Sequence, residues 1–162
     1  MPRPPLNREK SLGYQVNHLA RLLAHALRDR IEPLGVVPGQ FAQLRALYEC
    51  DGLTQAELCA RVQIEQPTMA RTLARMERDR LIKRVPDPDD RRQSLVMVSP
   101  LARDLEDELL SAAASVNALA TRGLDEREVA AFMTMMAKVI DNLQATKSVS
   151  NRLADDDQQL SR

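Results

Sequence analysis

Apolar residues recur every three or four positions over four long stretches of the chain, which is the spacing of one face of an α-helix. These stretches are residues 12–27, 38–51, 101–119 and 129–143. Pro33 and Gly35 end the first stretch, and Gly123 separates the last two. The sequence therefore predicts a long first helix, a second helix that opens with Pro38 near its first position, and two helices after residue 99.

Two shorter helices are expected in the middle of the chain. Residues 54–57, Thr-Gln-Ala-Glu, have the form of a capping box, which predicts a third helix as far as about residue 62. Gln66 can cap a fourth helix with Pro67 at its first position, and this helix is expected to end near Asp79. The close succession of the two predicts a helix-turn-helix.

A β-hairpin is expected directly after the fourth helix. Residues 81–85 and 95–98 are rich in branched apolar side chains, and residues 86–90 between them, Pro-Asp-Pro-Asp-Asp, are typical of turns. The hairpin would therefore carry a long, charged tip. Ser99 and Pro100 then cap the fifth helix, and Asp125 with Glu128 begins the sixth.

The order of these elements predicts a mostly α fold with a small β-wing, that is, a winged helix-turn-helix domain plus a helical dimerisation region. Residues 1–36 would form an N-terminal dimerisation helix, 37–99 the winged domain, and 100–145 two C-terminal dimerisation helices. From residue 146 onward, Ser, Asn, Asp and Gln dominate without a visible period. We therefore expect residues 146–162 to form a mostly disordered tail.

Composition narrows the class of protein. No apolar run approaches the roughly 20 residues of a membrane span, and the N-terminus lacks the apolar stretch of a secretory signal. The sequence therefore predicts a cytoplasmic protein without a membrane partner. The two cysteines, Cys50 and Cys59, lack the spacing of a metal or redox motif, so buried spectator thiols are favoured over a redox role.

The formal net charge of zero argues at first against a nucleic-acid partner, but the charges are unevenly distributed. Residues 61–92 hold nine basic and six acidic side chains, whereas residues 101–145 hold four basic and eight acidic ones. The chain is therefore electrically polarised, with the positive part over the fourth helix and the hairpin.

The fourth helix carries the main functional signal. At 100° per residue its apolar side chains gather on one side and its arginines on the other; the apolar ones are Met69, Leu73 and Met76, and the basic ones are Arg71, Arg75 and Arg78. Gln66 and Thr68 lie in the first turn, where a recognition helix reaches base edges in the major groove. Arginine can pair with guanine and glutamine with adenine. The plain alternative is a solvated helix face.

Two neighbouring features favour DNA over that alternative. Arg91 and Arg92 at the hairpin tip can enter the narrow minor groove, provided that an acidic neighbour such as Asp90 pairs with one of them. A charged solvent turn is the alternative reading. The start of the third helix, with Thr54 and Gln55, offers free amides to a backbone phosphate.

These residues resemble the MarR family of transcription regulators, and within it most closely the SlyA type. The likeness rests on residues 53–58 (LTQAEL), 64–73 (IEQPTMARTL) and 89–92 (DDRR), and the element order matches from about residue 12 to 145. The resemblance implies a homodimer in which the first, fifth and sixth helices interlock. It also implies Arg71 as a base or phosphate contact and Arg92 as the wing-tip residue.

The chain departs from the family pattern at two positions. The family has glycine where Arg80 and Ala102 stand here. A left-handed conformation at Arg80 would cost on the order of 1 kcal/mol and reshape the turn from helix to strand. The resemblance further implies a cleft for a small aromatic acid, with His18, Arg21 and His25 as candidate effector-binding residues on position alone.

The function expected from the sequence is a sequence-specific DNA-binding transcription regulator, most simply a ligand-responsive repressor, that binds a near-palindromic operator as a homodimer. The candidate contacts to double-stranded DNA are Thr54, Gln55, Gln66, Pro67, Thr68, Arg71, Thr72, Arg75, Arg91 and Arg92. Activation instead of repression is left open. No cofactor is expected, and His18 with His25 lack the further acidic or thiol ligand at helical spacing that a metal site needs.

An enzyme is disfavoured because the chain has no Ser/His/Asp order, no glycine-rich phosphate loop and no paired carboxylates in an apolar setting. A protein-interaction adaptor is the stronger rival, since a winged helix does not dictate DNA binding. The basic face of the fourth helix together with Arg91 and Arg92 favours DNA over an adaptor.

Overall fold

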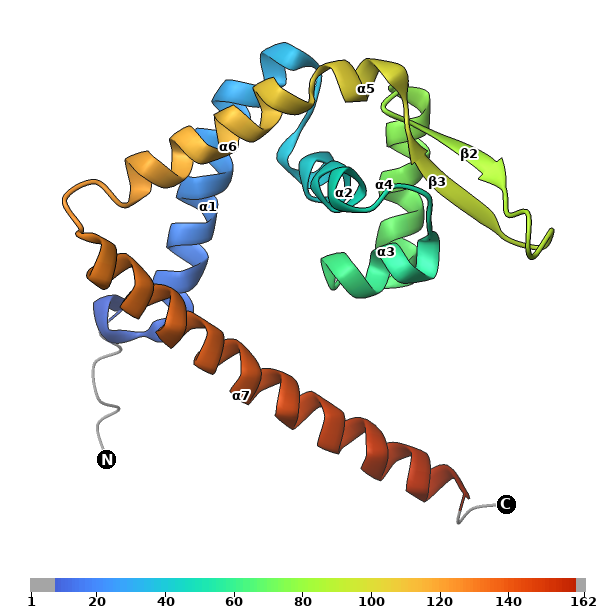
Figure 1. The fold of residues 1–162 in the computed structure, drawn as a ribbon. Helices are drawn as coiled ribbons and strands as arrows, with labels where there is room; N and C mark the ends of the chain where they lie inside the picture. Colours follow the sequence, from blue (N-terminus) through green and yellow to red (C-terminus); the bar gives the residue numbers. More distant parts are fainter. Residues whose placement is uncertain (1–7, 160–162) are drawn as a thin grey trace. The chain divides into compact units, whose positions relative to one another are not determined.

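The computed structural model describes the backbone of residues 8–159 and the side chains of residues 9–146. The chain divides into two compact units, residues 1–120 and 121–162, which are described separately. The first unit contains most of the elements in Figure 1, namely α1 (Leu12–Ile31), α2 (Pro38–Glu49), β1 (Leu53–Thr54), α3 (Gln55–Val62), α4 (Gln66–Arg78), β2 (Ile82–Pro86), β3 (Ser94–Val98), α5 (Pro100–Asp104) and α6 (Glu106–Ala120), with single 3-10 turns at Arg8–Lys10 and Glu32–Leu34. The second unit contains α7 (Glu126–Gln159). The predicted fold class is confirmed.

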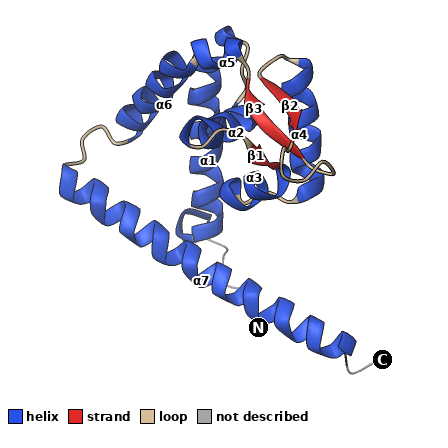
Figure 2. Cartoon of the chain, turned by 45° about the vertical axis from the view of Figure 1, so that its right-hand side comes forward, coloured by secondary structure: helices blue, strands red, loops and turns tan. Residues whose placement is uncertain are grey.

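The sheet has one strand more than the sequence predicted. Its order is β1-β3-β2, and both pairings are antiparallel (Figure 2). Leu53 of β1 lies opposite Val96 of β3, and Ile82 of β2 lies opposite Val98. Because β1 contains only two residues, no alternating pattern could reveal it, and only its pairing with β3 defines it. The strand anchors the start of α3 to the wing.

A single hydrophobic core positions α4 under the sheet. The core gathers side chains of α2, α3, α4 and both long strands; its fully buried members include Leu44, Leu47, Leu58, Met69, Leu73, Met76 and Val96. The predicted apolar side of α4 is therefore confirmed, since Met69, Leu73 and Met76 are all 0% exposed. The opposite side of this helix is left free for solvent or a partner.

The turn between α4 and β2 is strained at Arg80, where the family pattern has glycine. Arg80 adopts a positive φ of 59°. The amide N–H of Arg80 donates to the carbonyl of Glu77, and that of Leu81 donates to the carbonyl of Met76. The carbonyl of Arg80 accepts from the Ser99 hydroxyl at 2.7 Å. These bonds hold a non-glycine residue in a conformation that costs about 1 kcal/mol.

The start of α4 and the continuity of the predicted fifth helix differ from the expectation. Glu65, not Gln66, is the N-cap of α4, so Gln66 opens the helix and Pro67 follows it. The predicted fifth helix is broken at Leu105 into α5 and α6. The Tyr48 hydroxyl donates to the carbonyl of Ala102 at 2.6 Å, which engages an acceptor that a continuous helix would use internally.

The second unit consists of a capped helix. The Asp125 carboxylate accepts the amide N–H groups of Arg127 and Glu128 at 2.8 and 2.9 Å, and the Asp125 N–H donates to the Glu128 carboxylate at 2.8 Å. The predicted start of this helix is confirmed. The helix continues to Gln159, so the structure differs from the expected disordered tail over residues 146–159, whereas residues 160–162 lie outside the described part.

No helix in the described part of the chain has both the length and the apolar character needed to cross a membrane.

Gln43 on α2 is an exception in the core. It is 0% exposed, and its amide has no hydrogen-bond partner among the residues that the structure describes. A buried amide without a partner costs about 1 to 3 kcal/mol. Gln43→Met, which has similar volume and no amide, is therefore expected to raise the free energy of unfolding by about 1 to 2 kcal/mol.

Urea unfolding followed by circular dichroism measures this change. The exposed Asn17 provides a control, because it lies on the side of α1 away from Leu12 and Leu19 and Asn17→Met should leave the midpoint in place. A midpoint for Gln43→Met at or below that of the parent protein would contradict the prediction.

Candidate nucleic-acid interface

The exposed side of α4 presents the polar residues that the sequence singled out. Gln66, Pro67 and Thr68 are exposed in its first turn, and Arg71 and Arg75 are exposed further along. They face outward because the residues between them on the helix fill the core. The structure therefore brings the predicted α4 residues onto one accessible surface.

Thr72 lies at the margin of this surface. It is half-buried, and its hydroxyl donates to the carbonyl of Thr68 at 3.0 Å. Because the hydroxyl is already bonded within the helix, Thr72 offers mainly its methyl group and its remaining acceptor to a partner.

The start of α3 lies beside the start of α4. Gln63 ends α3 in the left-handed conformation, with φ 56°, and the chain turns there into the next helix. The side chains of Gln55 and Gln66, the first residues of the two helices, meet in a hydrogen bond of 2.8 Å. Sequence reasoning placed both residues in the interface but missed their contact, because only the turn at Gln63 determines it.

The predicted capping box at the start of α3 is confirmed. The Glu57 carboxylate accepts from the Thr54 N–H and the Thr54 hydroxyl, both at 2.8 Å. These hydrogen bonds lower the pKa of Glu57 below its ordinary value. The carboxylate is therefore charged at neutral pH and occupies the donor groups of Thr54, which leaves Gln55 as the more available polar side chain at this helix start.

The hairpin tip carries an internal ion pair. The Asp90 carboxylate accepts from the side-chain amide of Gln93 at 3.0 Å, from the Arg92 N–H at 3.0 Å and from Arg92 Nε at 3.3 Å. The hydrogen bonds from Gln93 and Arg92 lower the pKa of Asp90. The prediction that Asp90 pairs with a neighbouring arginine is confirmed.

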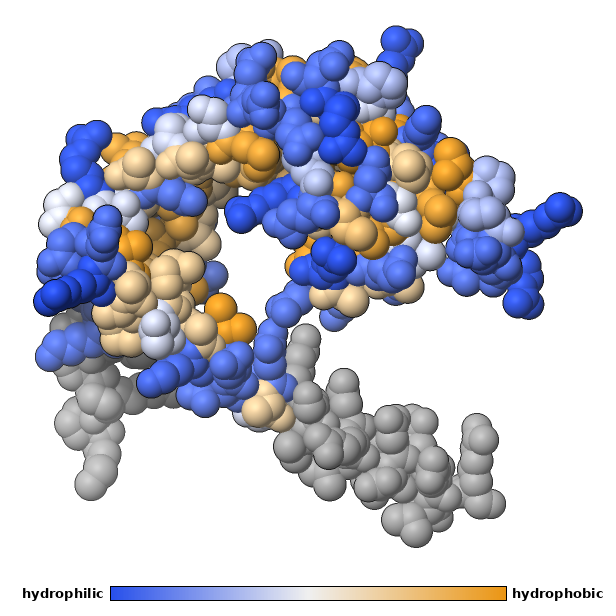
Figure 3. Space-filling view, viewed as in Figure 1, coloured by the Kyte–Doolittle hydropathy of each residue, from blue (hydrophilic) through white to orange (hydrophobic). Residues whose placement is uncertain are grey.

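The pairing leaves the wing arginines accessible. The Arg92 side chain is 91% exposed despite its bond to Asp90, and Arg91 is also exposed. The tip of the hairpin forms a strongly hydrophilic projection (Figure 3). The Asp90 carboxylate thus orients the Arg92 side chain while the Arg92 guanidinium remains exposed.

Acidic neighbours neutralise some of the basic groups but not others. Arg78 pairs with Asp79 at 3.2 Å, and Arg84 pairs with Glu77 at 3.6 Å. No carboxylate in the described part of the chain lies within ion-pair distance of Arg71. Arg71 and Arg75 on the exposed side of α4 and Arg91 at the wing tip therefore carry positive charge that no ion pair among the described residues neutralises.

The candidate effector residues lie on α1. His18, Arg21 and His25 are exposed; the His18 ring stacks on Tyr14 with centroids 6.3 Å apart, and His25 Nε2 lies 3.8 Å from Asp29. None of the three lines the hollow between α2 and α6 or the one beside the wing. Within the described residues, no group of three His, Cys, Asp or Glu side chains is arranged to hold a metal ion.

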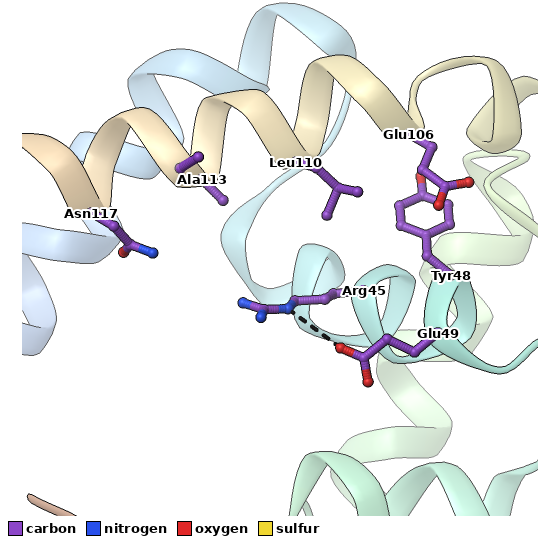
Figure 4. A pocket seen from close by; sticks show the side chains of 8 residues that line it. Arg45, Tyr48, Glu49, Glu106, Leu110, Ala113 and Asn117 are labelled. Atoms are coloured by element: carbon purple, nitrogen blue, oxygen red, sulfur yellow. Dashed lines mark ion pairs between the residues drawn. The ribbon is translucent and has the colours of Figure 1, made fainter. Parts of the chain in front are cut away.

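A hollow opens between α2 and α6, and its lining includes none of the three residues that the sequence proposed for an effector cleft (Figure 4). Its volume is about 320 Å³, and its walls include Arg45, Tyr48 and Glu49 from α2 and Glu106 and Leu110 from α6. Arg45 Nε lies 3.7 Å from the Glu49 carboxylate across its floor. The hollow combines charged groups with apolar wall, which suits a small amphipathic molecule.

One wall of this hollow is connected to the wing. Arg103 donates to Glu106 at 2.9 Å and to Asp51 at 2.8 Å, and the other oxygen of Asp51 accepts the Val98 N–H at the end of β3 at 2.9 Å. Burial, followed by the nearby Glu106 carboxylate, raises the pKa of Tyr48 to about 12. Tyr48 is therefore a neutral donor at physiological pH.

The two cysteines are not arranged as a pair. Cys59 is buried, and burial raises the pKa of its thiol; Cys50 is half-buried. A raised pKa keeps the Cys59 thiol protonated and unreactive, as expected for a spectator thiol.

The comparisons with known proteins agree with this geometry. Residues 34–93 match the model of the MarR family. The chain is also 30% identical over 100 residues to YwoH of Bacillus subtilis, an uncharacterized HTH-type transcriptional regulator, covering 62% of this chain and 72% of YwoH. The chain belongs to the MarR family.

Solved structures of diverse MarR-type regulators share the fold. A probable transcriptional regulator from Pseudomonas aeruginosa is 27% identical, with a TM-score of 0.75 over 81% of this chain and 98% of that one. A mutant MarR from E. coli, complexed with operator DNA, is 21% identical, with a TM-score of 0.77 over 85% of this chain and 99% of that one. The protein is thus a MarR-family transcription regulator with a DNA-binding winged helix.

Proposed function

We propose that this MarR-family protein binds a near-palindromic DNA operator as a homodimer and represses transcription until a small ligand releases it. The observation that carries the proposal is the exposed side of α4, where Gln66, Thr68, Arg71 and Arg75 lie opposite a fully buried apolar side. Amide and guanidinium groups in the first turns of a recognition helix are suited to base edges in the major groove.

The remaining contacts complete a footprint across two grooves. Arg91 and Arg92 at the wing would enter the minor groove, and Thr54 with Gln55 would face the backbone beside the recognition helix. Pro67 and Thr72 would supply apolar contacts at the edges of the α4 surface. The MarR of E. coli, which shares the fold, has been solved with operator DNA.

Dimerisation follows from apolar side chains that each unit leaves exposed. On α1 these are Leu12, Val16, Leu19 and Leu22, and on α7 they are Phe132, Met133, Met135, Ile140 and Leu143. Apolar stripes of this extent need a covering surface. A second copy of the chain provides one, and a twofold dimer would present two α4 helices to two half-sites.

Selection from a pool of randomised DNA duplexes tests the proposal. The full-length protein should enrich one sequence with two inverted half-sites, about one helical turn apart. Gel shifts with the enriched duplex and with a scrambled duplex of equal composition then measure specificity. Enrichment of no sequence would favour the rival interpretation of a protein-interaction adaptor.

Operator binding is expected to depend steeply on salt although the net charge of the chain is zero. One phosphate contact from α4 and one from the wing of each protomer would release about four counterions, so log K against log salt should have a slope of about −4. Fluorescence anisotropy from low to high salt measures the slope. A flat plot would contradict the assignment of both basic surfaces.

We further propose that a small aromatic acid acts as the effector. Two locations are available, the α1 surface with His18, Arg21 and His25, and the hollow between α2 and α6 that contains Arg45. A carboxylate ligand needs a cation in either place. The hollow is favoured further because hydrogen bonds through Glu106, Arg103 and Asp51 connect its wall to β3, so that a ligand there could act on the wing.

Salicylate titrated into the protein–operator complex tests this part. Release by the parent protein and by Arg45→Ala but not by Arg21→Ala would locate the effector on α1, and the reverse pattern would locate it in the hollow. No release from the parent protein would overturn the proposal of an aromatic acid effector.

We also propose that the protein is cytoplasmic and that, within the family, it is most closely related to the SlyA type. The second point rests on residues 64–73 (IEQPTMARTL), which form the turn and the first half of α4.

A further inference from the structure

We propose that Gln55 is a positioning residue for Gln66 and thereby determines which base the recognition helix selects. The inference rests on the proposed function and assigns to Gln55, beyond the proposed backbone contact, a role in base selection. Its basis is the hydrogen bond between the two side-chain amides, with Gln55 Nε2 donating to Gln66 Oε1 at 2.8 Å.

The fold brings these two amides together at a defined place. Gln55 is the first residue of α3 and is held there by the capping box of Thr54 and Glu57. Gln66 is the first residue of α4, eleven positions later, after the left-handed turn at Gln63. Gln66 is exposed, whereas Gln55 is half-buried. The half-buried amide therefore acts on the one that faces the partner.

The chemistry of the amide gives this bond a consequence for base selection. A glutamine side chain carries a donor group and an acceptor oxygen side by side, and rotation by 180° about its last bond exchanges them. In water both orientations are accessible to an exposed glutamine. A donor from Gln55 on Gln66 Oε1 favours one orientation, and a carbonyl oxygen keeps a second lone pair for a base.

Adenine is the base that matches the fixed amide. Its major-groove edge offers an acceptor, N7, beside a donor, the N6 amino group, whereas guanine offers two acceptors. An amide with both groups in fixed order complements adenine at both points. An amide that is free to rotate can also satisfy guanine with its amino group alone. The bond from Gln55 should therefore raise the preference for adenine over guanine at one base pair.

A phosphate contact by Gln55 makes a different prediction. Loss of a phosphate contact weakens binding to all sequences about equally, whereas loss of a positioning contact alters the preference at one position. Removal of an exposed hydrogen bond of this kind corresponds to about a three- to tenfold change in relative affinity. The two roles can thus be separated by comparing sequences rather than by affinity alone.

The experiment measures base preference at every position of the selected half-site for the full-length parent protein and its variants. Gln66→Ala should remove the preference at one base pair. Gln55→Ala should reduce the preference for adenine over guanine at that same base pair by about three- to tenfold and leave the other positions unchanged. The exposed Gln15 on α1, as Gln15→Ala, is the matched control and should alter no position.

Two further variants test the polarity of the contact. Gln55→Lys keeps a donor and should retain the adenine preference. Gln55→Glu offers only acceptors, so it should turn the Gln66 amide around and shift the preference away from adenine toward a base with an exposed amino group, that is, cytosine. Uniform changes in overall affinity are expected for both charged variants and do not enter the comparison.

The outcomes separate this inference from the proposed function. Equal weakening of all sequences by Gln55→Ala, or the same preference in the Lys and Glu variants, would overturn the positioning role while DNA reading stands. A parent protein that selects no sequence would overturn the proposed function, and the positioning role with it. Circular dichroism of each variant confirms that the fold is retained.

Discussion

Replacing Arg71 by alanine is expected to weaken operator binding by about 1 to 3 kcal/mol per half-site and to relax the preference at one base pair if the side chain reads a base. Arg71 is exposed in the second turn of α4, on the side of the helix opposite the buried Met69 and Leu73. Because a twofold dimer contacts two half-sites, the loss should appear twice in the complete operator. Operator affinity across singly substituted duplexes measures both effects.

Replacing Arg92 at the wing tip is expected to affect DNA binding in a different way. Arg92 is held by Asp90 at the hairpin tip and is expected to sense the width and potential of the minor groove. Arg92→Ala should therefore weaken binding most on operators with A·T-rich flanks and alter no major-groove preference.

The controls for both arginine variants are Arg122→Ala, which removes an exposed arginine outside the proposed footprint, and circular dichroism of each protein. If Arg71→Ala and Arg92→Ala both bind like the parent protein while remaining folded, the assignment of DNA contacts is wrong.

Placing a charge on the apolar stripe of α1 is expected to separate the dimer. Val16 is 53% exposed in the single chain, so Val16→Glu should not disturb the fold of the protomer. At a twofold interface the substitution buries two unpaired carboxylates, and each costs several kcal/mol. Even about 2 kcal/mol for each carboxylate, about 4 kcal/mol in total, would raise the dissociation constant of the dimer by roughly a thousandfold.

Sedimentation velocity at micromolar concentration measures this shift. Arg28→Glu, at an exposed position on the other side of α1, introduces the same side chain outside the stripe and should leave the dimer intact. A parent protein that sediments as a monomer, or a Val16→Glu variant that remains dimeric, would contradict the proposed dimer. Loss of the dimer should also weaken operator binding, because a single α4 helix reaches only one half-site.

The sequence by itself determined the helices, the hairpin and the two-sided character of α4. These features are local: a period of 3.6 residues, a capping box at 54–57 and turn residues at 86–90 all act within a few positions along the chain. The same local reasoning anticipated the bond between Asp90 and an arginine, whereas the family pattern, not the local sequence, drew attention to the turn at Arg80. Neighbouring residues alone decide such features, so a single sequence contains the information.

Only the tertiary structure decided the features that join distant parts of the chain. The pairing of β1 with β3 brings Leu53 to Val96, and the Tyr48 bond to Ala102 accompanies the break between α5 and α6. The hollow between α2 and α6 and the contact of Gln55 with Gln66 likewise depend on how helices pack. No local period records such contacts, because their energies depend on the distance between side chains in space and not on their separation along the chain.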